Sequence, residues 1–225
     1  MSVERSIRQY EDDRRQAAKI AARLLLASAT TSPRVGGVGE CTIQIIDDEC
    51  DIEELCQATE QMSGDNEKWD FFKRDAMMLR DADAVLVVTS IRCLTDPADI
   101  NCNVCGKLTC EYQRLAPKLT PEPGIAYTGP LCLFRANNIS YAIEAIISTA
   151  RNMGIDYGVY WSAGAAAMRM AIVPKNTGFC LAVGISVTEK SPFRDIPKDY
   201  ADINETTMND RIIKRLWPQF RSIYS

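Results

Sequence analysis

The chain contains no histidine, and this absence removes a large part of protein chemistry from consideration. A catalytic triad that uses imidazole as its base cannot form. Zinc sites that need an imidazole ligand are excluded for the same reason. Chemistry in this protein must therefore use thiolates, carboxylates or the atoms of a bound cofactor.

The chain also lacks a net positive charge and long apolar runs. The formal net charge of −4 gives no electrostatic reason to expect nucleic acid or an anionic membrane as a partner. The charged start of the chain lacks the apolar region of a signal peptide. Apolar runs such as Ala84 to Val88 are too short to cross a bilayer. We expect a cytoplasmic protein whose 225 residues form a single domain, 1–225.

Cysteine, by contrast, is abundant: the chain has nine, an odd number. In a reducing compartment disulfides are not expected, and clustered thiols indicate metal or redox chemistry. Cys102, Cys105 and Cys110 follow a C-x2-C-x4-C spacing, and Cys132 comes later, after Pro130. Glycine at position 106 suits the tight turn that two thiolates on one metal centre require. Such a turn can also direct backbone N–H groups at sulfur.

These four cysteines form an all-thiolate ligand set of the kind that [4Fe–4S] clusters use, and we predict one such cluster on them. A structural zinc site is the main alternative, although zinc ribbons usually carry two CxxC pairs and this chain has one. A thioredoxin-type redox pair and chance clustering are further alternatives. Cys93 lies close enough in sequence to be a spare ligand, whereas Cys41, Cys56 and Cys180 fit ordinary buried thiols.

The hydrophobic periodicity predicts helices alternating with short strands, hence an α/β (α+β) sheet packed by helices. Between residues 93 and 130 the periodicity disappears, and this stretch holds five of the ten prolines. We interpret residues 93–132 as an irregular cysteine-rich insertion. The expected helices are 10–28, 51–62, 67–80, 134–153, 163–168 and 208–224, and the expected strands are 41–46, 83–88, 157–161 and 179–187.

Three segments together resemble the DUF2148 family, proteins with a ferredoxin domain known mainly from anaerobic bacteria and archaea. They are FFKRDAMMLRDADAVLVV, NCNVCGKLTC and the segment that begins GPLCLFRANNISYAIEAIISTA. The resemblance covers about residues 17–195. It implies a [4Fe–4S] cluster on the four cysteines named above, and no established reaction.

A weaker resemblance is to the flavin-dependent nitroreductases, which begin with an RRSxR-like segment and end with a strand followed by a basic residue. It implies a nitroreductase-like sheet, a homodimer, and bound FMN with Arg5, Ser6, Arg8 and Arg194 near its phosphate. The tyrosine–proline pair of that family is absent here. The alternative for Arg5 and Arg8 is a solvated chain end without a ligand.

We therefore expect an iron–sulfur protein of anaerobic redox metabolism, acting as an oxidoreductase or electron-transfer protein with possible FMN. No side chain in the sequence stands out as an acid–base catalyst. An alternative is a non-catalytic electron-carrier or adaptor subunit that docks to a redox partner protein through the insertion. A structural four-cysteine zinc protein is the remaining alternative.

Overall fold

The computed structural model describes residues 3–37, 41–91, 100–115, 124–127, 129–175 and 177–194. The helices are α1 (Val3–Thr30), α2 (Glu49–Met62), α3 (Phe71–Arg80), α4 (Cys110–Leu115), α5 (Leu133–Asn152) and α6 (Trp161–Arg169). The strands are β1 (Cys41–Ile46), β2 (Ala84–Ile91), β3 (Asp156–Tyr160) and β4 (Thr177–Ser186). Short 3₁₀ turns occupy Val35–Gly37, Ser63–Asp65 and Glu67–Trp69.

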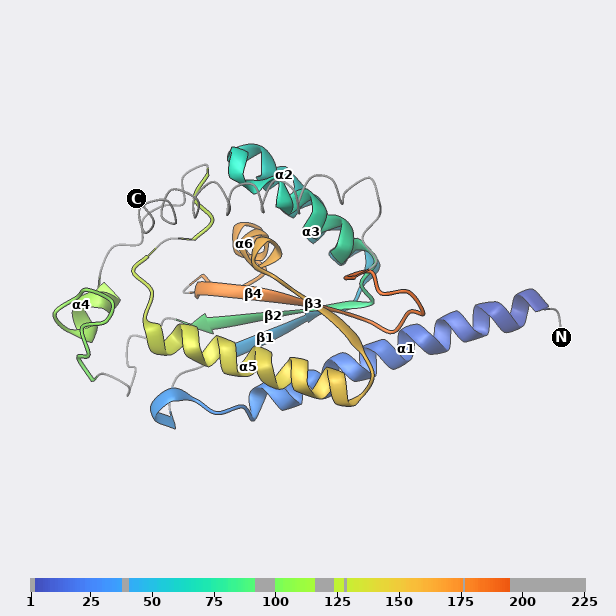
Figure 1. Cartoon of the computed structure of the whole chain (residues 1–225), viewed down its shortest axis with the longest axis horizontal. Helices are drawn as coiled ribbons and strands as arrows, with labels where there is room; N and C mark the ends of the chain where they lie inside the picture. The colour runs from blue at the N-terminus through green and yellow to red at the C-terminus, as the bar shows by residue number, and fades with distance from the viewer. Residues whose placement is uncertain are drawn as a thin grey trace, which may run out of the picture.

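The strands form one sheet of order β1-β2-β4-β3, and every neighbouring pair is antiparallel. Helices cover both faces (Figure 1): α1 and α5 lie on one face, and α2, α3 and α6 lie on the other. The α+β class predicted from the sequence is confirmed. The register puts Val87 of β2 between Gln44 of β1 and Ala182 of β4.

Strand β2 shows why its apolar run is nearly continuous. Successive side chains in a strand point to opposite faces, so both faces of a covered central strand must be apolar. Val85 and Val87 pack into the core under α2, α3 and α6, whereas Leu86 and Val88 pack under α1 and α5. All four are fully buried. The expectation of a strand buried on both faces is therefore confirmed.

The helix expected over residues 67–80 is wrong as one continuous element. The side chain of Asn66 accepts a hydrogen bond from the backbone N–H of Lys68, 3.0 Å away, which starts a separate 3₁₀ turn. Helix α3 begins only at Phe71. The turn is held by packing, because the ring of Trp69 is buried and stacks on Phe72 with centroids 4.8 Å apart.

Two segments lie away from the layered body, at opposite ends of the molecule (Figure 1). One is the cysteine-bearing segment around α4, and the other is the N-terminal part of α1. The helix expected over residues 208–224 lies outside the described residues. Within the described ranges, no helix is both long enough and apolar enough to cross a membrane.

Candidate functional site

The segment from Asn101 to Cys110 folds back on itself through residues with a left-handed backbone. Asn101 and Asn103 have φ of 49° and 57°, and Gly106 has φ of 74°. The N–H of Gly106 donates to the carbonyl of Asn103 at 3.0 Å, which closes a turn around Cys105. The predicted turn at Gly106 is confirmed, and its positive φ is the conformation that glycine adopts without strain.

Side chains fasten the two ends of this turn and join it to the segment of the fourth cysteine. The amide oxygen of Asn101 accepts from the N–H of Cys110 at 2.8 Å, so the start and end of the turn are tied together. Gln113 is buried, and its Nε2 donates to the carbonyl of Pro130 at 2.9 Å. Because Pro130 is two residues before Cys132, this bond holds the segment of Cys132 beside α4.

Cys132 occupies the N-cap position of α5, a helix of 20 residues. Its backbone is extended there, and its carbonyl accepts from the N–H of Ala136 at 3.1 Å. A thiolate at the first turn of a helix is stabilised by the helix dipole. A cis peptide bond joins Gly129 and Pro130 just before it.

The ligand set is chemically suited to a thiolate-bound metal centre. Of the four predicted ligands, Cys102 is exposed, and Cys105, Cys110 and Cys132 are partly buried. None of the eight cysteines that the structure describes forms a disulfide. Over the described residues, no three cysteine or carboxylate side chains converge into a metal-binding group. The fold therefore places the three-cysteine turn beside the segment of Cys132, but the described thiols do not assemble into a metal-binding group.

The remaining described cysteines are chemically different. Cys56 and Cys180 are buried, and burial raises the pKa of each thiol to about 12. Cys41 is half-buried in β1, and burial raises its pKa as well. These three were expected to be ordinary packed thiols, and the burial of Cys56 and Cys180 confirms this for two of them. Cys50 is exposed on α2, and Cys93 lies outside the described residues.

Tyr127 fastens the cysteine-bearing segment onto the core. Its hydroxyl donates to the carbonyl of Cys180 at 2.6 Å and lies 3.0 Å from the carbonyl of Trp161. Its ring packs on Phe179, with centroids 4.7 Å apart. A Cβ on Gly164 would lie 2.4 Å from the Cys180 oxygen and 2.8 Å from the Tyr127 hydroxyl. Only glycine at position 164 therefore permits this close approach of α6 to β4.

The four residues predicted to contact a flavin phosphate are not assembled into one visible site. Arg5 and Ser6 lie in the first turns of α1, and their side chains are outside the described part of the structure. Arg8 is exposed on the same helix. Arg194 is 69% exposed and pairs with Asp156 at 3.4 Å. Their joint role as a flavin site stays a prediction.

A largely buried ion pair that the sequence did not reveal joins α1 to Asp83, the residue before β2. Nη1 of Arg14, on α1, donates to a carboxylate oxygen of Asp83 at 2.6 Å, with side-chain exposures of 14% and 8%. The other carboxylate oxygen accepts from the N–H of Val187 at 2.8 Å and from the hydroxyl of Ser186 at 3.2 Å. Burial opposes the charge of Arg14, but its hydrogen bonds to Asp83 and Glu11 prevail, and its pKa is raised.

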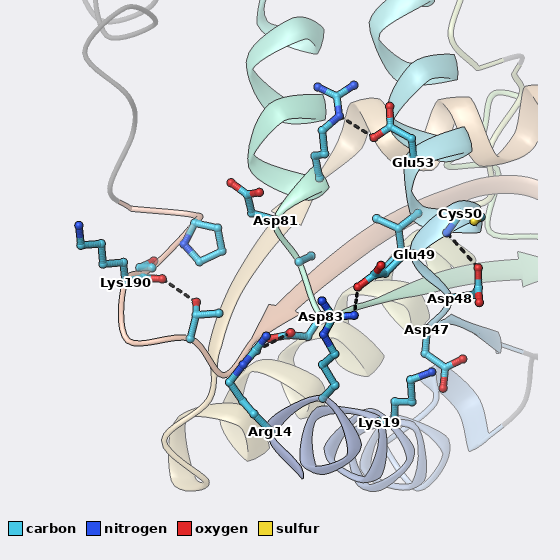
Figure 2. A pocket seen from close by; sticks show the side chains of 17 residues that line it. Arg14, Lys19, Asp47, Asp48, Glu49, Cys50, Glu53, Asp81, Asp83 and Lys190 are labelled. Carbon is cyan, nitrogen blue, oxygen red and sulfur yellow. Dashed lines mark hydrogen bonds and ion pairs between the residues drawn. The ribbon is translucent and has the colours of Figure 1, made fainter. Parts of the chain in front are cut away.

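This ion pair forms one wall of a pocket of about 950 Å³ (Figure 2). The pocket lies between α1, the start of α2, the start of β2 and the turn after β4. Its volume is within the range of small-molecule sites. Five basic and six acidic side chains line it, so its net charge alone does not select an anion. Lys19 and Lys190 line it and form no ion pair within the described residues.

A second buried carboxylate lies on the opposite face of the sheet. The hydroxyl of Ser162, at the start of α6, donates to Asp75 of α3 at 2.6 Å. Both side chains are buried. Burial raises the pKa of Asp75, while the bond from Ser162 and the charge of Arg74 oppose that shift. This hydrogen bond links α6 to α3.

Comparison with known proteins connects residues 128–195 of the chain to one family. The model of a family described as uncharacterized proteins containing a ferredoxin domain (DUF2148) matches residues 128–195. The match includes Cys132 and spans α5, α6 and β4. It begins after the other three predicted ligands. An uncharacterized protein from Archaeoglobus fulgidus is 28% identical over 185 residues, which is 82% of this chain and 95% of that protein.

Several solved structures with a similar arrangement are named as nitroreductases. A nitroreductase with bound FMN from Desulfitobacterium hafniense has a TM-score of 0.49 and 11% identity, covering 80% of this chain and 82% of its own. An FMN-dependent nitroreductase from Clostridium difficile has a TM-score of 0.44 and 15% identity, with coverages of 81% and 84%. The predicted resemblance to the ferredoxin-domain family is thus confirmed over residues 128–195.

Proposed function

We propose that this chain is an iron–sulfur redox protein that holds one [4Fe–4S] cluster on Cys102, Cys105, Cys110 and Cys132. The observation that carries the proposal is the cross-link made by Gln113, which joins the three-cysteine turn to the segment of the fourth cysteine. The match of residues 128–195 to a family with a ferredoxin domain supports the same interpretation. When bound, such a cluster would accept one electron from a donor protein and release it to an acceptor.

The backbone around the proposed ligands is consistent with this role. The turn at Gly106 and the first turn of α5 both present backbone N–H groups close to cysteine. Such groups stabilise the negative charge of thiolate ligands and tune the potential of the centre. The protein's contribution would therefore be to hold the three-cysteine turn beside the segment of Cys132.

The test is anaerobic purification, a visible absorption spectrum, and assays of iron, sulfide, zinc and flavin on one sample. We expect broad brown absorbance and about four irons and four sulfides per chain. Cys132→Ser should lose most of the iron, whereas Cys50→Ser should retain it, because Cys50 is an exposed thiol on α2. Stoichiometric zinc without iron, or iron retained equally by both variants, would exclude the proposed cluster.

We further propose that FMN is a second cofactor, with Arg5, Ser6, Arg8 and Arg194 near its phosphate. The support is the sequence resemblance to flavin-dependent nitroreductases, together with the exposed guanidinium groups of Arg8 and Arg194. Arg194→Ala should lower the FMN content of the purified protein, while Arg169→Ala, an exposed arginine on α6, should not. Protein that contains no flavin when purified and binds no added FMN would exclude this second cofactor.

A second candidate function is an electron-carrier or adaptor subunit without flavin, and a specific surface favours it. Large apolar side chains of the cysteine-bearing segment are strongly exposed: Ile100 by 59%, Val104 by 60%, Leu108 by 82%, Tyr112 by 66% and Leu115 by 67%. Exposed apolar patches commonly mark protein contacts. Leu108→Ser should slow reduction of the chain by a ferredoxin and leave reduction by dithionite unchanged.

A further inference from the structure

Two buried polar atoms, one on α3 and one on β3, have no hydrogen-bond partner among the residues that the structure describes. One is the hydroxyl oxygen of Tyr160, the last residue of β3, which is only 5% exposed. The other is Nε of Arg74 on α3, which is enclosed although the arginine side chain as a whole is 28% exposed. Buried polar groups are costly without a partner, and ordered water commonly supplies one.

The carboxylate of Asp75 belongs to the same cluster. Its Oδ2 accepts from the hydroxyl of Ser162 at 2.6 Å, whereas its Oδ1 lies 3.9 Å from Nε of Arg74. A separation of 3.9 Å is too long for a hydrogen bond, and polar atoms at such a distance are often bridged by water. Burial raises the pKa of Tyr160, the charge of Asp75 raises it further, and the charge of Arg74 opposes the rise, so the phenol lies near both charged groups.

The position of the Tyr160 hydroxyl depends on Gly158. The two residues are two positions apart in β3, so they share one face of the sheet. A Cβ on Gly158 would lie 2.5 Å from the hydroxyl and 2.8 Å from two ring carbons, so the ring lies back along the strand over the glycine. Phe193 also packs against the ring, with centroids 6.1 Å apart. The hydroxyl is therefore held inside the protein.

The chemistry of the cluster selects an uncharged ligand that both donates and accepts. Nε of Arg74 only donates, the hydroxyl of Tyr160 donates or accepts, and Oδ1 of Asp75 accepts when the carboxyl is ionised. Arg74 would repel a cation, and ionised Asp75 would repel an anion. Water suits all three groups and either protonation state of Asp75, because it turns to donate or to accept.

We propose that Arg74, Asp75 and Tyr160 bind one internal water molecule, which links α3 to β3. The water accepts from Nε of Arg74 and bonds to the hydroxyl of Tyr160 and to Oδ1 of Asp75. Three bonds are typical of a buried water, and globular proteins hold about one such water per 27 residues. Through Ser162, which donates to Asp75, the same network reaches the first turn of α6.

The site lies next to the attachment point of the cysteine-bearing segment. Ser162 follows Trp161, and the carbonyl of Trp161 is 3.0 Å from the hydroxyl of Tyr127. The water therefore completes the hydrogen bonding of residues that hold the first turn of α6, onto which that segment is fastened. The proposal does not depend on a bound cofactor, because none of the three water-binding residues is a predicted ligand.

A high-resolution crystal structure of the full, cofactor-loaded chain tests the site directly. We expect one ordered water about 2.7–3.2 Å from Nε of Arg74, Oδ1 of Asp75 and the hydroxyl of Tyr160. A water bonded to fewer than two of these atoms overturns the proposal. So does a direct hydrogen bond between Arg74 and Asp75 in its place, or an ion at the same position.

Tyr160→Phe tests the water in solution. If the hydroxyl bonds to water, its removal should lower the folding equilibrium constant about fivefold in urea unfolding, because one net hydrogen bond is lost. Tyr157→Phe, in the same strand, is the matched control. The Tyr157 hydroxyl accepts from Nε of Arg151 at 2.7 Å in an exposed contact, so solvent replaces the lost bond and the effect should be smaller.

The sign of the effect of Tyr160→Phe separates the two possibilities. If the hydroxyl of Tyr160 is without any partner, the variant should be more stable than the wild-type chain, because a buried polar group without a bond is removed. A gain in stability therefore overturns the proposal. A loss no larger than that of Tyr157→Phe overturns it as well.

Discussion

Replacing Asp83 by alanine should destabilise the protein far more than removing an equally short ion pair on its surface. Asp83 is 8% exposed and accepts hydrogen bonds from Arg14, Ser186 and Val187. The matched control is Glu53→Ala. Glu53 also contacts an arginine, Arg80, at 2.6 Å, but the two side chains are 38% and 37% exposed.

The size of the effect follows from burial. Breaking a buried pair by removing one partner costs about 3–5 kcal/mol, because a charge is left without compensation. Arg14 is 14% exposed and keeps its contact with Glu11, so we expect the lower end, about 3 kcal/mol. For a chain of this size that is a fall in melting temperature of about 6–12 °C. Exposed ion pairs contribute below about 1 kcal/mol to stability, so Glu53→Ala should lower the melting temperature by no more than about 4 °C.

Differential scanning calorimetry and urea unfolding measure both variants against the wild-type chain. If Asp83→Ala and Glu53→Ala lower the free energy of unfolding equally, the reasoning from burial is refuted. A loss for Asp83→Ala below about 1 kcal/mol would also refute it, because the three hydrogen bonds would then contribute almost nothing net.

Three further predictions follow. Gly164→Ala should destabilise the fold by about 1–3 kcal/mol in urea unfolding, because the new Cβ would clash with backbone on β4. Asp75→Asn should gain stability relative to wild type as pH rises from about 4 to 7. Burial raises the pKa of Asp75 in the folded state. The stability that protonated Asp75 contributes to the wild-type protein is therefore present at low pH and is lost as pH rises through that folded pKa. In the native protein at pH 8, iodoacetamide should modify Cys50 and leave Cys56 and Cys180 unmodified, since burial raises both pKa values to about 12, as peptide mass spectrometry would show.

Periodicity predicted the elements whose structure depends on nearby residues. Strand β1 has the predicted bounds, Cys41–Ile46, and the run from Ala84 identified the central strand. Periodicity failed where packing between residues far apart in the sequence determines the local structure. Trp161 was assigned to a strand but begins α6, where its ring meets Tyr127 with centroids 5.3 Å apart. That contact joins residues 34 positions apart, and no local pattern encodes it.

The same contrast between local and distant interactions holds at the candidate site. The cysteine spacing and Gly106 were readable from the sequence because the turn is local. The residues that fix the segment in place were missed, since Gln113 and Tyr127 act on partners 17 and 53 positions away. The ion pair of Arg14 was missed for the same reason, because its partner Asp83 is 69 positions distant. Asn101 alone offered a local signal, because asparagine often caps nearby backbone N–H groups.

The bond from Gln113 to Pro130 has a consequence for how a metal centre would be assembled. Cys110 and Cys132 are 22 positions apart, and closing a flexible loop of that length costs roughly 3 kcal/mol of chain entropy. Folding of the metal-free protein already closes that loop through Gln113. An incoming metal would therefore meet a chain in which the loop between Cys110 and Cys132 is already closed. Gln113→Ala should leave the ligands intact and lower metal affinity, an effect of loop entropy and not of coordination chemistry.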